Sequence, residues 1–152
     1  IFIGTVIAAF SEEIMFRGML LNTLKGKIPL ISAMIISSLG FSVMHITTIF
    51  AGKTLIQALV NVTASSLLGF AFVPLAIILN NILPLAIFHT LWNFIIIASS
   101  TMGINISKLY LFCNPINIII SIILWTIIIK KQKKSTFSKN KLVFSEKLIN
   151  SI

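Results

Sequence analysis

The chain has 152 residues, of which 57% are hydrophobic and 10% are charged, and its mean hydropathy is +1.07. Soluble globular domains average about 25% charged residues, so the composition excludes that class and predicts an integral membrane protein. The net charge is +9, but most of the lysines lie beyond the last apolar run, which favours contact with lipid over binding of nucleic acid.

Five apolar stretches are long enough for helices that cross a hydrocarbon core of about 30 Å, each of which needs about 20 residues. The predicted helices cover residues 1–24, 29–50, 54–79, 82–102 and 109–129. Pro29 suits the first turn of the second helix. Pro74 should make the third helix kink or stop early, and Pro115 should kink the fifth near its start. The sequence therefore predicts an all-α fold, a polytopic bundle of about five transmembrane helices.

Positive charge is distributed unequally between the two ends of these helices. Lys25, Lys27 and the first four lysines after the last apolar run lie on one side, whereas Lys53 and Lys108 lie on the other. The positive-inside rule therefore predicts a cytoplasmic C-terminus. Five spans in this orientation place Ile1 outside, so we expect further helices upstream of this chain.

The chain divides into a predicted transmembrane core over residues 1–129 and a basic tail over residues 130–152. The tail is rich in lysine, and we expect it to be poorly ordered or to lie on the membrane surface near anionic lipids.

Two adjacent glutamates, Glu12 and Glu13, lie inside the first apolar stretch, and Arg17 follows them. A charged side chain at bilayer depth costs about 2.5 to 3.5 kcal/mol on insertion scales, so such a residue indicates a functional site by default. On an α-helix Glu13 and Arg17 face each other, whereas Glu12 points about a quarter turn away. We therefore expect Glu13 and Arg17 to form a buried pair that supports the fold, and Glu12 to act as a general base or acid.

The two histidines, His45 and His89, also lie inside apolar runs. His89 and Asn93 are four residues apart, so both project from one face of the fourth helix. A neutral imidazole and a carboxamide offer N–H donors without net charge, which suits the stabilisation of an oxyanion. Each of these residues also has a structural interpretation as a hydrogen-bonding group between helices. The clustering of nearly all intramembrane ionisable groups into three short motifs favours a site.

The depth of the two histidines in the membrane poses a geometric problem. In straight helices His45 lies about 24 Å, and His89 only about 10 Å, from the cytoplasmic ends of their spans. A common site therefore requires helix boundaries several residues away from the predicted ones, or helices that tilt, kink near Gly40, or end below the membrane surface.

The three motifs, in register, resemble those of a known family. They are Glu12-Glu13-x-x-x-Arg17, Phe41-x-x-x-His45 and His89-x-x-x-Asn93. Together they resemble the CPBP family of intramembrane endopeptidases, which comprises CAAX proteases and bacteriocin-processing enzymes and is also called the Abi family. The resemblance covers about residues 1–100 and implies an eight-helix bundle, of which this chain would hold the last five helices.

The resemblance also implies a role for each motif residue. It implies that Glu12 and His45 activate the attacking water, that His89 and Asn93 stabilise the tetrahedral oxyanion, and that Glu13 and Arg17 support the geometry. We expect no cofactor. If zinc is present, its ligands would be Glu12, His45 and His89, which match a common catalytic set of two histidines and one glutamate, although the His-Glu-x-x-His helix is absent.

We therefore expect an enzyme, an intramembrane endopeptidase that cleaves a peptide or protein substrate at the membrane. The abundance of isoleucine, asparagine and lysine is typical of an AT-rich bacterium, so we expect a bacterial cell membrane and the processing of a bacterial peptide or bacteriocin, with CAAX-type proteolysis as the eukaryotic counterpart. Two alternatives remain open. One is a bacteriocin self-immunity or regulatory protein that acts by binding, and the other is a fragment of a proton-coupled transporter in which Glu12 carries the proton.

Overall fold

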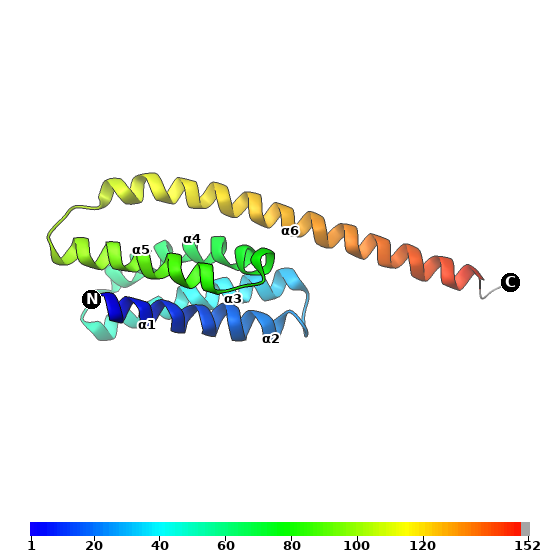
Figure 1. The fold of residues 1–152 in the computed structure, drawn as a ribbon, viewed down its shortest axis with the longest axis horizontal. Coiled ribbons are helices and arrows are strands. Elements are labelled where there is room, and N and C mark those ends of the chain that lie inside the picture. Colours follow the sequence, from blue (N-terminus) through cyan, green and yellow to red (C-terminus); the bar gives the residue numbers. More distant parts are fainter. Residues whose placement is uncertain (150–152) are drawn as a thin grey trace.

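The structure is a computed structural model that describes the backbone of residues 1–149 and the side chains of residues 1–138. Within that part of the chain all regular elements are helices. Figure 1 shows antiparallel helices stacked as a bundle, with one long helix, α6, running along it at a small tilt and continuing well beyond it toward the C-terminus. The predicted all-α bundle is confirmed.

The N-terminal helical segment consists of α1 (Phe2–Glu13), the π-helical η1 (Ile14–Leu21) and the short α2 (Asn22–Leu24), which follow one another without a break. After a turn come α3 (Leu30–Met44) and the 3₁₀-helical η2 (His45–Ala51), and then α4 (Leu55–Leu79), α5 (Leu83–Thr101) and α6 (Ser107–Ile149). The helix ends agree with the predicted ones to within one or two residues, apart from the C-terminal end of the last helix.

Four helices in the described part of the chain are long and apolar enough to cross a membrane, namely residues 30–51, 55–79, 83–101 and 107–138. The N-terminal helical segment, the fifth predicted span, is not one of these four and carries three charged residues, Glu12, Glu13 and Arg17. It nevertheless packs along α5 within the bundle. The chain is a multi-pass membrane protein.

The turn after α2, which holds Lys25 and Lys27, lies at one end of the bundle, and the connections around Lys53 and Lys108 lie at the other (Figure 1). This is the arrangement that the alternating spans predict. The cytoplasmic placement of the C-terminus stays a prediction.

The last helix is longer than predicted. The sequence placed its end at residue 129, where the apolar run stops, but α6 continues through the lysine-rich segment to Ile149. That boundary is wrong for a physical reason. Lysine and glutamine are good helix formers, and the sequence contains no glycine or proline between Pro115 and Ile149, so the loss of apolar residues does not end the helix.

The α4 helix continues past Pro74 to Leu79, so the expectation of an early stop is wrong. A proline lacks the N–H that would bond to the carbonyl four residues earlier, which here is that of Phe70. Trp125 of α6 donates its Nε1–H to this carbonyl at 2.8 Å. A neighbouring helix therefore supplies the missing donor, which is how membrane proteins tolerate proline within a span.

The α3 and α4 helices approach closely at Gly69. A Cβ atom at this position would lie 3.1 Å from Phe41 Cδ1 and 3.3 Å from the Ser38 carbonyl oxygen. Small residues allow such close helix contacts in membranes, where apolar burial against lipid contributes little. Phe41 is fully buried at this contact, next to the motif residues Arg17 and His45. The apolar core continues beside it and includes Leu21, Met34, Phe72, Leu85 and Ile128.

Candidate active site

Glu13, Arg17 and His89 form one buried polar cluster. Glu13 Oε1 accepts a hydrogen bond from Arg17 Nη1 at 3.0 Å and a second from His89 Nδ1, also at 3.0 Å. All three residues are at most 1% exposed. The structure thus contains the predicted Glu13–Arg17 pair. It adds His89 as a third member, which brings the first and third motifs together.

Glu12 meets the other side of the same imidazole. Its Oε2 lies 3.6 Å from His89 Nε2, and its side chain is 17% exposed. The two adjacent glutamates therefore face the two opposite nitrogens of one ring. Helical geometry correctly separated their directions, but it could not show that His89, 76 residues further along the chain than Glu13, lies between them.

The helix changes from α to π directly after Glu13. A π-helix bonds each N–H to the carbonyl five residues earlier, so the segment is wider than an α-helix, and such segments are frequent at functional sites. The Ser37 hydroxyl of α3 donates to the Phe16 carbonyl within this segment at 2.8 Å. No pattern in the sequence predicted the π-helix.

Phe41 forms an aromatic wall against the cluster. The Arg17 guanidinium carbon lies 4.2 Å from the centre of the Phe41 ring, a cation–π contact. The same ring packs edge-on against His45 and His89, with centroid distances of 5.0 and 5.7 Å. The phenylalanine of the second motif therefore contacts the arginine and both histidines. Around it, Arg17 Nε and Glu13 Oε2 are buried without a hydrogen-bond partner among the described residues.

His45 lies where α3 passes into the 3₁₀ segment η2. Its Nδ1 is 3.0 Å from the carbonyl oxygen of Phe41. Because a carbonyl can only accept, Nδ1 carries the hydrogen, and Nε2 of the neutral ring is left as an acceptor. A half-buried imidazole with a free acceptor nitrogen can accept a hydrogen bond from water.

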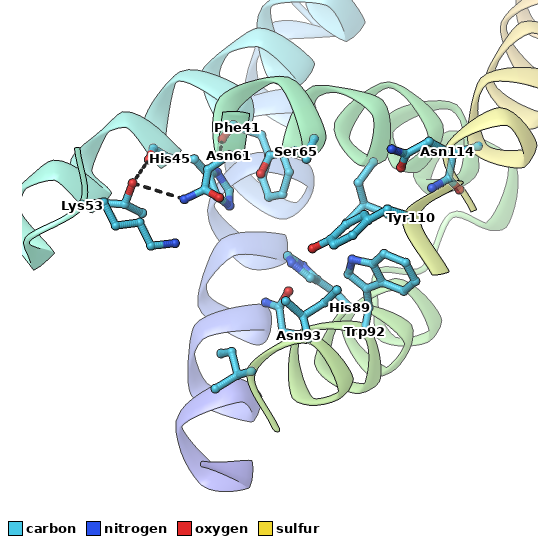
Figure 2. Close-up of a pocket in the computed structure, with 16 residues that line it drawn as sticks. Phe41, His45, Lys53, Asn61, Ser65, His89, Trp92, Asn93, Tyr110 and Asn114 are labelled. Carbon is cyan, nitrogen blue, oxygen red and sulfur yellow. Dashed lines mark hydrogen bonds between the residues drawn. The ribbon is translucent and has the colours of Figure 1, made fainter. Parts of the chain in front are cut away.

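A cavity of about 240 Å³ lies beside the cluster and is lined by His45, His89 and Asn93 (Figure 2). Glu12, Glu13 and Arg17 are not among its lining residues, so the cluster borders the cavity through His89. The cavity extends along the helices, since His89, Asn93 and Ile97 of α5 all line it. His45 and His89, which straight helices place at different depths in the membrane, therefore line one cavity. The length of the cavity resolves this difference in depth.

The cavity also contains polar residues that the sequence analysis did not single out. They are Thr48, Lys53, Asn61, Ser65, Tyr110, Asn114 and Asn117. Most of them could have been predicted from the sequence, because they are polar side chains at helical spacing inside apolar runs. That spacing is four residues in α4 and three or four in α6.

The described side chains, residues 1–138, contain no group of three or more His, Cys, Asp or Glu residues placed to hold a metal ion. Glu12, His45 and His89, which a zinc ion would need together, do not form such a group. His45 turns its Nδ1 to a backbone carbonyl, and His89 turns its Nδ1 to Glu13. Each ring therefore has its Nε2 left for another partner, but the three side chains are not assembled around one point in this structure.

Comparison with known proteins adds the family. No curated protein and no solved structure matches the chain. A model of the family described as type II CAAX prenyl endopeptidase Rce1-like matches residues 1–95, which are more than half of the chain and hold all three motifs. This agrees with the resemblance to CPBP proteases. The chain belongs to the Rce1-like family of type II CAAX prenyl endopeptidases.

Proposed function

We propose that this protein is an intramembrane endopeptidase that hydrolyses a peptide bond with a water molecule activated by Glu12 and His45. The observation that carries the proposal is the arrangement of Glu12, His89 and Glu13 in one buried cluster next to a polar cavity. Membership of a CAAX endopeptidase family supports peptide hydrolysis as the reaction.

Glu12 suits the role of general base better than Glu13 does. Glu13 is 0% exposed and already accepts two hydrogen bonds, whereas Glu12 is 17% exposed and its buried Oε2 has no hydrogen-bond partner among the described residues. In the proposed reaction a water oxygen attacks the carbonyl carbon of the peptide, and its proton passes to Glu12. Glu12 then returns the proton to the leaving amine, while His45 Nε2 accepts a hydrogen bond from the attacking water.

The proposed role of His89 depends on which of its ring nitrogens carry hydrogen. Because Glu13 holds the Nδ1–H, stabilisation of an oxyanion by His89 would require a second N–H, at Nε2. Glu12 Oε2 lies 3.6 Å from this nitrogen, so Glu12 and the oxyanion would both be neighbours of the Nε2–H. With the Asn93 amide, this N–H would stabilise the oxyanion of the tetrahedral intermediate.

Glu13 and Arg17 act as positioning residues in this proposal. Glu13 fixes the orientation of the His89 ring through Nδ1, and Arg17 holds the Glu13 carboxylate from the next turn of the helix. Neither residue lines the cavity, and both are at most 1% exposed, whereas Glu12 is 17% exposed. Their proposed contribution is the geometry of His89.

The test compares Glu12→Gln, His45→Ala and the control Thr47→Ala in the purified protein. The substrates are a prenylated peptide that ends in a CAAX sequence, of the kind that the family description names, and a bacterial peptide precursor with its leader. General acid–base groups contribute about 10²- to 10⁴-fold, so cleavage by the first two variants should fall by at least 100-fold with thermal unfolding unchanged. Thr47 has an exposed side chain near His45, and its substitution should leave cleavage unchanged.

Full cleavage by Glu12→Gln would refute the proposed mechanism. Protection against a bacteriocin that survives both substitutions would indicate immunity by binding. Uptake of a solute that depends on a pH gradient, without a cleaved product, would indicate transport by a proton carrier at Glu12.

A further inference from the structure

The polar face of α6 provides a site beyond the three motifs. We infer that Tyr110, Asn114 and Asn117 bind the main chain of the substrate peptide in an extended conformation, beside the catalytic residues. The inference rests on the proposed endopeptidase function and specifies how the same cavity holds its substrate. The family match ends at residue 95, so these three residues lie outside it.

The three residues form one stripe on α6. Their spacing of four and then three residues places them within an arc of about 60° around the helix. All three are half-buried and line the cavity, whereas Ile116, Ile119 and other neighbours on α6 are exposed and apolar. The polar stripe therefore points inward, and the apolar remainder of the span covers the outside.

Their polar groups have no partner within the described part of the protein. Neither asparagine amide nor the Tyr110 hydroxyl makes a side-chain hydrogen bond there, although the backbone carbonyl of Asn117 accepts one from Ser121. Polar side chains in a membrane span are costly, and those retained there commonly mark a substrate pathway. Unpartnered donors and acceptors that face a cavity are available to a ligand.

The stripe matches the chemistry of an extended peptide. Each peptide unit in a membrane cavity brings an N–H and a C=O that need partners, and a carboxamide offers both a donor and an acceptor without adding charge. Tyr110 and Asn114 are about 6 Å apart along the helix axis, close to the repeat of about 6.6 Å between every second residue of a strand. The whole stripe, about 10 Å long, spans about three residues of peptide.

The stripe also lies next to the catalytic groups. The Tyr110 ring packs edge-on against Trp92 of α5 at a centroid distance of 6.1 Å, and Trp92 directly precedes Asn93. Figure 2 shows the Tyr110 hydroxyl pointing into the same pocket that His89 lines. A main chain bound along α6 would therefore pass the proposed oxyanion site, with the scissile bond near the Tyr110 end of the stripe.

The test is the double variant Asn114→Leu/Asn117→Leu, which keeps the size of both side chains and removes their hydrogen bonds. Loss of two such bonds should raise the KM for the peptide that the wild type cleaves about ten-fold or more, with kcat changed by less than about three-fold. Asn114→Gln/Asn117→Gln should restore most of the affinity. The control Asn22→Leu makes the same change at an exposed position outside the cavity and should alter neither constant.

Direct binding separates this inference from the proposed reaction. Both test peptides are titrated against Glu12→Gln protein, with and without the two leucine substitutions. Binding that the leucines weaken supports the inference even if the wild type cleaves neither peptide. Binding that is unchanged by the leucines, a KM equal to that of the wild type, or no binding of either peptide to Glu12→Gln protein would overturn it.

Discussion

Replacement of Glu13 by Gln isolates the contribution of the buried ion pair to the fold. Glu13 is 0% exposed and holds both the Arg17 guanidinium and the His89 ring at 3.0 Å. Glutamine keeps the shape and can still accept a hydrogen bond, but it leaves the charge of Arg17 buried without its partner. Breaking a buried pair in this way costs about 3 to 5 kcal/mol. We expect the free energy of unfolding in detergent to fall by that amount.

The double variant Glu13→Gln/Arg17→Met provides the control. It removes both charges, replaces the arginine with an apolar side chain of similar length, and leaves a carboxamide oxygen for His89. Stability should return to within about 1 kcal/mol of the wild type, because replacing a whole buried pair is often neutral. Glu12→Gln, at the more exposed of the two glutamates, should change stability little. Wild-type stability in Glu13→Gln, or a double variant as unstable as the single one, would refute this reasoning.

Three further substitutions test the packing around the site, each by thermal unfolding in detergent. Gly69→Ala places a Cβ atom 3.1 Å from Phe41 Cδ1. Because α3 and α4 must then move apart, the free energy of unfolding should fall by about 1 to 3 kcal/mol. Stability equal to the wild type would show that the two helices are not closely packed. Trp125→Phe removes the donor to the Phe70 carbonyl that Pro74 leaves free, and should lower the free energy of unfolding by about 1 to 3 kcal/mol. In a Pro74→Ala background the same change should have no such cost, because the backbone N–H of residue 74 then bonds to this carbonyl. Ser37→Ala removes a buried hydrogen bond to the π-helical segment and should cost about 1 kcal/mol, and no loss would mean that this bond contributes nothing.

The positions of the helices follow largely from the sequence. Runs of about 20 apolar residues predict spans because the bilayer has a definite thickness, and the observed ends agree closely. The exception is the C-terminal end of α6, since the apolar run ends at residue 129 but the helix continues to Ile149. Hydropathy reports the environment of a segment, whereas helix formation also depends on backbone propensity, and the lysine-rich segment keeps that propensity.

The identity of the motif residues, and the pairing of Glu13 with Arg17, also follow from the sequence. Helical geometry alone predicts a contact between residues that are four positions apart. A charged residue inside an apolar run indicates a functional site. The structure alone shows that the third motif enters the same cluster, with His89 between the two glutamates. The contact between Glu13 and His89 joins residues 76 positions apart, and no periodicity encodes such a distance.

The sequence by itself determined that this is a helical membrane protein with a few costly polar residues in three motifs, because each of those properties is local. Only the tertiary structure decided which of these residues line a cavity and which do not, and that α6 contributes a polar wall. The packing of Gly69 against Phe41, the π-helical turn after Glu13 and the bond from Trp125 to α4 each depend on neighbouring helices. The physical reason is that a polar group in lipid must find its partner inside the protein, and the fold determines where that partner lies.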